Sequence, residues 1–153
     1  MDRTQLDQVL DTWGSQVEIH EGPTRFLADF ERVPAKLRPI IAGAWCDYEV
    51  CNGGLRQFFE NSTGVLAPEA SAAFESLHLS TLATVVREGI ALFGEPYPRD
   101  RKTRMRLLNS EAGVAIRSSL ELLDTQFFAA RTGPGRFDSR WETAAAMWLA
   151  PAR

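Results

Sequence analysis

Side chains that could do chemistry gather in one short stretch of the chain, residues 49–61, with the sequence EVCNGGLRQFFEN. Gln57 and Asn61 are four residues apart and would share one face of a helix, and Glu49 lies about one turn before the two glycines. With Asn52 added, a carboxylate and three amides would form a polar pocket that could bind a small ligand or polarise a water molecule. Amides are poor acids and bases, and no nucleophile or histidine lies nearby in the sequence, so we predict no catalytic residue.

The same stretch also has a structural interpretation, which we favour. Gly53 and Gly54 would interrupt a helix, because glycine adopts left-handed backbone without a Cβ penalty, and a short second helix would leave at a sharp angle. Glu49 or Asn52 could accept hydrogen bonds from the free N–H groups at the start of that helix. Full burial of one large apolar side chain contributes about 1.5–3 kcal/mol. The apolar residues that would hold the short helix against the core are Leu55, Phe58 and Phe59.

The N-terminal part of the chain is acidic, although the net charge is only −3. Residues 1–31 contain seven acidic residues and two basic ones. Gly14 could bend or end the helix expected over residues 3–19. If it does not break the helix, four of these carboxylates fall within about 80° of one another and form a stripe about 16 Å long from Asp7 to Glu18. The stripe could bind a basic protein partner, and a solvated face without a partner is the alternative. The stripe consists of Asp7, Asp11, Glu18 and Glu21.

Residues 99–106 are basic and could hold a phosphate or an acidic partner. No aromatic residue is interleaved with the five basic side chains, and the whole chain is acidic, so we expect no direct binding of nucleic acid. His20 and His78 are isolated, and no three or four metal ligands occur at a recognisable spacing. We therefore predict neither a metal nor a cofactor.

Apolar residues recur with a helical period along the chain, and no segment alternates strictly as a strand would. We predict a single all-α domain over residues 1–153, a bundle of about seven or eight helices. No apolar run approaches the ~18 residues of a membrane span, and the N-terminus lacks the features of a signal peptide, so we expect a cytoplasmic protein. Helices are expected over residues 3–19, from Pro23, from Pro34 to the glycines, over 55–61, from Pro68, from Ser80, near 99–108, from Ser110 to about Phe128, and after Asp138 or Ser139.

Residues 49–61, with Gly64 after them, resemble a bacterial domain family of unknown function whose members carry the motif E-x-x-N-G-G-F-x-Q-F-F-x-N. Leu55 stands where that family usually has an aromatic residue. The likeness extends from about Leu37 to Phe128 and includes the run 120–124, LELLD. The resemblance implies an all-α fold. It also implies a link to a dimeric DNA mimic protein, which binds a transcription factor in place of DNA.

Together, the resemblance and the acidic stripe favour a non-enzymatic protein-binding module that binds a basic partner, such as a DNA-binding regulator. The resemblance also raises the expectation of a homodimer. A related alternative is an immunity or antitoxin-type protein. An alternative of another class is a small-molecule binder or enzyme that uses the polar pocket. A DNA mimic crowds carboxylates over its surface, whereas this chain has 20 acidic and 17 basic residues.

Overall fold

The computed structural model describes residues 3–135 and 139–151. These ranges contain eight α-helices and two short 3-10 helices, so the predicted all-α fold is confirmed. The elements in chain order are α1 (Arg3–Trp13), η1 (Gly14–Gln16), α2 (Pro23–Arg32), α3 (Arg38–Glu60), η2 (Ser62–Leu66), α4 (Ala67–Ser76), α5 (Ser80–Ala91), α6 (Arg101–Asn109), α7 (Gly113–Arg131) and α8 (Arg140–Leu149).

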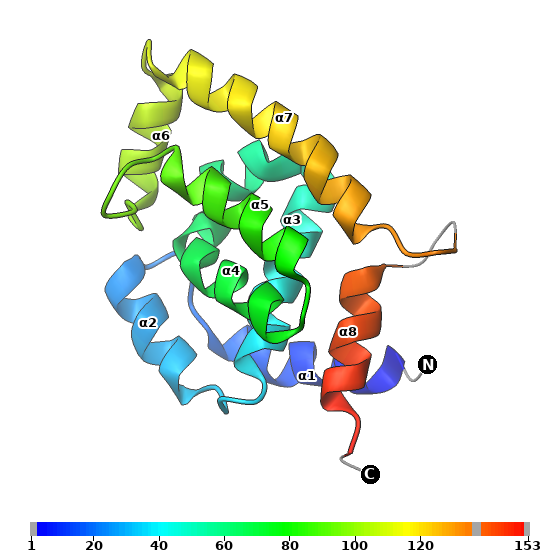
Figure 1. Cartoon of the computed structure of the whole chain (residues 1–153). Coiled ribbons are helices and arrows are strands. Elements are labelled where there is room, and N and C mark those ends of the chain that lie inside the picture. The colour runs from blue at the N-terminus through cyan, green and yellow to red at the C-terminus, as the bar shows by residue number, and fades with distance from the viewer. Residues whose placement is uncertain (1–2, 136–138, 152–153) are drawn as a thin grey trace.

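Helix α3 is the central element of the fold and contacts α1, α4, α6, α7 and α8 (Figure 1). Helices α4 and α5 pack against each other on one side of it, and α7 runs across the top of the view in Figure 1. Residues 40–44 of α3 are all buried, because neighbouring helices surround this part of it. A helix that is apolar all round belongs in a core, and this one positions the motif at its C-terminal end.

Two contacts from the first part of α3 hold the outer helices in place. The carboxylate of Asp47 is fully buried and accepts from Arg131 of α7, with Nε–Oδ1 at 2.7 Å and Nη2–Oδ2 at 2.9 Å. Trp141 of α8 packs over Gly43, where an added Cβ would lie 2.3 Å from the indole Nε1. The absence of a side chain at Gly43 therefore lets α8 approach α3 closely.

An unbroken helix over residues 3–19 is not formed, and the chain departs from it at Gly14, the position where the sequence allowed a break. Helix α1 ends at Trp13, η1 follows, and Val17 has extended backbone with φ −104° and ψ 113°. Val17 is buried in the core, so the chain leaves the helical path where this side chain packs and then leads into α2. Glu18 and Glu21 consequently lie outside the helix that carries Asp7 and Asp11.

Other predicted boundaries differ by a few residues. Helix α3 begins at Arg38 rather than Pro34, and α7 begins at Gly113 rather than Ser110. Ser139 caps α8, since its Oγ accepts the N–H of Glu142 at 3.3 Å, whereas Asp138 lies outside the described residues.

Candidate functional site

The motif forms a corner inside α3. Gly53 has φ −157° and ψ 21°, and Gly54 has φ 76° and ψ 179°, so neither continues the helix. The positive φ of Gly54 is a conformation that glycine adopts without steric cost. Residues 55–60 then resume helical geometry as a short second part, which is the interruption that the sequence predicted.

An acidic residue of α7 caps this second part of α3. The backbone N–H of Leu55 donates to Oδ1 of Asp124 at 2.7 Å. We predicted Glu49 or Asn52 as the acceptor for the helix start, and the acceptor found there is a residue 69 positions from Leu55. Burial raises the pKa of Asp124, while the bond from Leu55 acts in the opposite direction. Asp124 ends the run 120–124 included in the resemblance, and that is the one sequence signal that pointed to it.

Glu49 is the centre of the polar part of the corner. Its Oε2 accepts from Nε2 of Gln57 at 2.8 Å and from Nδ2 of Asn61 at 3.1 Å, and its Oε1 accepts from Oγ1 of Thr63 at 3.0 Å. The structure thus brings together three of the four predicted pocket residues, while Asn52 is exposed to solvent. Thr63 was missed, because it follows the motif and reaches Glu49 only through the turn of η2.

The apolar part of the corner is fixed in the core. Phe58 and Phe59 are both fully buried, with ring centroids 5.2 Å apart. Phe59 also packs against Phe93 and Tyr97, with centroids at 5.0 and 6.2 Å. This packing fixes the direction in which the second part of α3 leaves the corner.

Much of the basic stretch is used inside the fold, at the C-terminal end of α3. The guanidinium of Arg104, which is fully buried, donates from Nε to the carbonyl of Phe59 at 2.8 Å and from Nη2 to that of Asn61 at 2.9 Å. Nε of Arg101 donates to the carbonyl of Glu60 at 3.0 Å. Cations are favourable here because the last carbonyls of a helix are unpaired and carry partial negative charge. Burial lowers the pKa of Arg104, yet arginine remains protonated in proteins.

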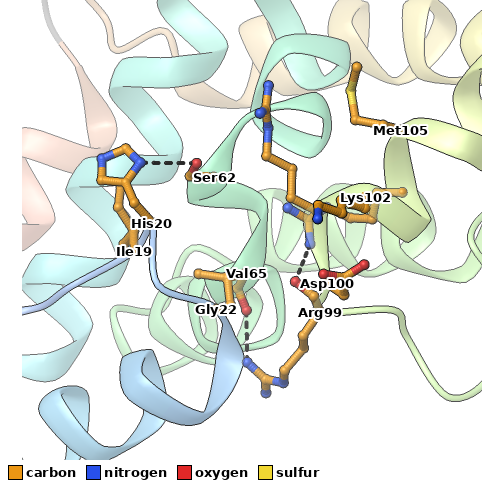
Figure 2. Close-up of a pocket in the computed structure, with 11 residues that line it drawn as sticks. Ile19, His20, Gly22, Ser62, Val65, Arg99, Asp100, Lys102 and Met105 are labelled. Atoms are coloured by element: carbon orange, nitrogen blue, oxygen red, sulfur yellow. Dashed lines mark hydrogen bonds between the residues drawn. The ribbon is translucent and has the colours of Figure 1, made fainter.

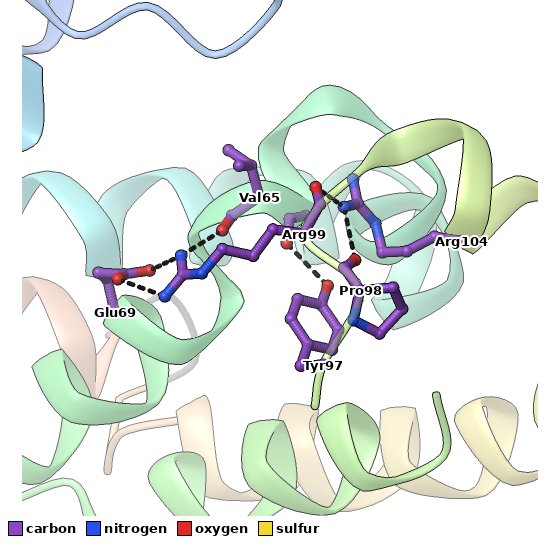
Figure 3. Close-up of polar contacts among 7 residues, drawn as sticks. Val65, Glu69, Tyr97, Pro98, Arg99 and Arg104 are labelled. Carbon is purple, nitrogen blue, oxygen red and sulfur yellow. Dashed lines mark hydrogen bonds and ion pairs between the residues drawn. The ribbon is translucent and has the colours of Figure 1, made fainter. Parts of the chain in front are cut away.

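Neighbouring polar contacts fix the loop before α6 to η2 (Figure 3). Arg99 forms a two-pronged ion pair with Glu69, both bonds 2.8 Å long, and also donates to the carbonyl of Val65. The hydroxyl of Tyr97 donates to the carbonyl of Gly64 at 2.7 Å, and burial raises its pKa. Arg99 is therefore neutralised within the protein.

The residues of the predicted acidic stripe lie in two different settings. Asp7 and Asp11 are exposed and one turn apart on α1, so they share a face. Glu18 is half-buried and accepts from the backbone N–H of His20 at 2.6 Å. Glu21 is exposed, and its Oε2 lies 3.7 Å from Nη1 of Arg25. The structure keeps Asp7 and Asp11 together as one acidic pair.

Five cavities of about 220 to 480 Å³ lie on the described part of the chain, and none of these five is lined by Glu49, Asn52, Gln57 or Asn61. The carboxylate of Glu49 instead has hydrogen-bond donors at both oxygens. These contacts suit a structural corner that joins the two parts of α3 to η2.

A comparison with protein-family models matches residues 31–146 to the model described as DMP19-like protein. The chain belongs to this family. DMP19 is a DNA mimic protein, so the relationship to a DNA mimic inferred from the motif is confirmed. The DMP19-like match covers the corner and Asp124. It leaves out the four acidic residues between positions 7 and 21. No curated protein and no solved structure matches the chain.

Membership of the DMP19-like family is compatible with a protein-binding module. No helix in the described residues is both long and apolar enough to cross a bilayer. Within the same ranges, no three His, Cys, Asp or Glu side chains are grouped so that they could hold a metal ion.

Proposed function

We propose that this DMP19-like chain is a non-enzymatic protein-binding module that binds a basic surface of another protein, such as a DNA-binding regulator. The observation that carries the proposal is the family match over residues 31–146, because the family is named after a DNA mimic. A DNA mimic presents carboxylates to a protein surface that otherwise binds phosphates. The partner class is therefore one with a patch of lysine and arginine side chains.

The acidic pair Asp7 and Asp11 is the part of the surface that we assign to this partner. Both side chains are exposed on one face of α1, and a helical rise of 1.5 Å per residue separates them by about 6 Å along the axis. Asp29 is buried and paired with Arg25 and Arg32. The negative field that we assign to the partner therefore comes from the exposed carboxylates of Asp7 and Asp11. Such a field acts over roughly 10 Å at 0.1 M salt, so it favours a basic surface in close contact.

The corner itself supports a role without catalysis. Gln57, Asn61 and Thr63 all donate to the carboxylate of Glu49, and a carboxylate held in this way is poorly placed to accept a substrate proton. Phe58 and Phe59 are fully buried and cannot contact a partner in this conformation. Recognition is therefore assigned to the surface outside the motif.

Reversing the acidic pair tests the proposal. The tagged wild-type chain, the double variant Asp7→Lys/Asp11→Lys and the control Glu111→Lys/Glu121→Lys are each used to capture proteins from a lysate of the source organism at about 0.1 M salt. The control reverses two exposed carboxylates at and near α7, which Figure 1 places at the opposite end of the molecule from α1. We expect the first variant to lose the partner by about tenfold or more, and the control to retain it.

Elution with duplex DNA then identifies the kind of partner. A DNA-binding regulator held through its DNA-binding surface should be released by duplex DNA that carries its binding site, and higher salt should weaken the complex. Retention of the same partner by the Asp7/Asp11 variant would contradict the assigned surface. A partner that duplex DNA does not displace would favour the immunity-type alternative over a regulator.

A further inference from the structure

A cavity of about 480 Å³ lies between the loop before α2, the 3-10 helix η2 and the first turn of α6 (Figure 2). In the view of Figure 2, His20 and Ser62 stand on one side of it, and Asp100 and Lys102 stand on the other. Nδ1 of His20 lies 3.1 Å from Oγ of Ser62, which joins the loop to η2. The volume falls within the roughly 300–1,000 Å³ range of small-molecule sites.

The lining has an excess of positive charge after internal partners are taken into account. Arg99 is neutralised by Glu69, whereas Arg101, Lys102 and Arg104 bring three cations and Asp100 brings one carboxylate. Oδ2 of Asp100 accepts from the N–H of Thr103 at 2.8 Å and from its hydroxyl at 2.9 Å, which ties this carboxylate to α6. Three cations against one carboxylate leave a net excess of two positive charges at the lining.

Two of the cations have donor groups left for a ligand. Within the described residues, the ammonium group of Lys102 has no hydrogen bond and no carboxylate within 4 Å. Arg101 uses its Nε on the carbonyl of Glu60, and both Nη groups remain available to an acceptor at the cavity. Both residues line the cavity, as do His20 and Ser62. Because His20 and Ser62 share one hydrogen bond, a neutral His20 leaves one donor between these two side chains, so the cavity offers donors from Lys102, Arg101 and one of this pair.

The cavity also has an apolar part, to which Ile19, Val65 and Met105 contribute. An inorganic ion would leave these side chains uncovered, whereas an organic group attached to the anion would bury them. We propose that this cavity binds a small organic phosphate monoester, with the phosphate at Lys102 and Arg101 and the organic group against Ile19 and Val65, which Figure 2 draws on the same side. A phosphate monoester carries up to two negative charges and three terminal oxygens, which suits several cationic and hydroxyl donors better than a carboxylate does.

The proposal does not depend on the protein-binding function, since the cavity uses none of the acidic pair on α1. The proposal also does not require the N-terminus of α6 to bind the anion, because the side chain of Asp100 already accepts the N–H of Thr103 there.

Titration calorimetry with phenyl phosphate as the probe tests this site in the full chain. We expect saturable binding at one site per chain, weaker binding of inorganic phosphate, and no binding of phenol. Lys102→Ala should weaken the binding of phenyl phosphate about tenfold, because it removes a charged donor. Arg106→Ala is the matched control, since Arg106 is an exposed cation of the same helix that does not line the cavity, and it should leave the affinity unchanged.

A second variant, Lys102→Glu, should abolish binding while leaving the unfolding temperature close to that of the wild type, because the side chain is exposed. Absence of saturable binding to the wild type, or equal weakening by Lys102→Ala and Arg106→Ala, would overturn the proposal. Equal affinity for phenyl phosphate and inorganic phosphate would overturn the role of the apolar part.

Discussion

Replacing Arg104 with methionine is expected to lower the free energy of unfolding by about 3–5 kcal/mol. The guanidinium is fully buried and donates to four backbone carbonyls, those of Phe59, Asn61, Pro98 and Arg99. Methionine retains much of the apolar stem but removes every donor, and each buried acceptor left without its partner costs about 1–3 kcal/mol. Urea unfolding followed by circular dichroism measures the loss, which is a large part of the total stability of a typical domain.

The arrangement around Arg104 explains why lysine should not replace it. The carbonyls of Phe59 and Asn61 belong to the end of α3, and those of Pro98 and Arg99 belong to the loop before α6, so one planar group joins two segments. A lysine ammonium has three donors on a flexible stem and cannot reproduce this fork. Arg104→Lys should therefore lie between the wild type and Arg104→Met.

Arg106→Met is the control for the Arg104 variants. Arg106 is exposed on the same helix, with bonds of 3.5 Å to the carbonyl of Lys102 and 3.2 Å to Oγ1 of Thr103. Its replacement should change the free energy of unfolding by no more than about 0.5 kcal/mol. A loss below about 1 kcal/mol for Arg104→Met would show that the buried guanidinium does not hold the corner.

Replacing Gly54 with alanine is the second large effect, with an expected loss of about 3 kcal/mol in the free energy of unfolding. Gly54 has φ 76° and ψ 179°, a region that is essentially restricted to glycine and costs another residue about 1–3 kcal/mol. The added Cβ would also lie 2.6 Å from Oδ2 of Asp124, so the carboxylate that caps Leu55 would have to move. Loss of that cap adds about 1 kcal/mol.

Gly94→Ala separates the two contributions. Gly94 has φ 93°, yet an added Cβ there would meet no atom within 4 Å. This variant should therefore show only the backbone cost, about 1–2 kcal/mol. Equal losses for Gly54→Ala and Gly94→Ala, measured by urea unfolding, would show that the contact with Asp124 contributes nothing.

The sequence predicted the parts of the corner that depend on local chemistry. Two adjacent glycines destabilise the helix that contains them by about 1 kcal/mol each relative to alanine, and the positions of Phe58 and Phe59 within one helical turn after Leu55 favour a buried face. The shared face of Gln57 and Asn61 follows from their spacing of four residues, whereas their bonds to Glu49 depend on the angle of the corner at Gly53 and Gly54.

The partners that come from distant segments could not be predicted in the same way. Asp124 and Arg104 reach the corner from 69 and 45 residues away, and no periodicity in the sequence specifies such contacts.

Gly14 marked a possible end of the first helix, and α1 does end beside it at Trp13. Val17 packs in the core with extended backbone, so the helical pattern does not continue through it. Of the four carboxylates expected in one stripe, Asp7 and Asp11 therefore lie on α1, and the other two lie beyond its end.

We assign a structural role to the motif and partner binding to α1. The affinity of the captured partner for the Glu49→Gln variant tests this assignment most directly. The new amide keeps one oxygen for Gln57 and Asn61 but presents an NH2 group to Thr63, and it lacks the negative charge that the three donors share. The variant should therefore unfold more readily, by about 1–3 kcal/mol. Titration calorimetry, at a temperature where the variant is folded, should give a dissociation constant within about twofold of the wild type, whereas Asp7→Lys/Asp11→Lys should raise it about tenfold. A loss of affinity in the folded Glu49→Gln protein, with binding retained in the Asp7/Asp11 variant, would contradict this assignment and place recognition at the motif.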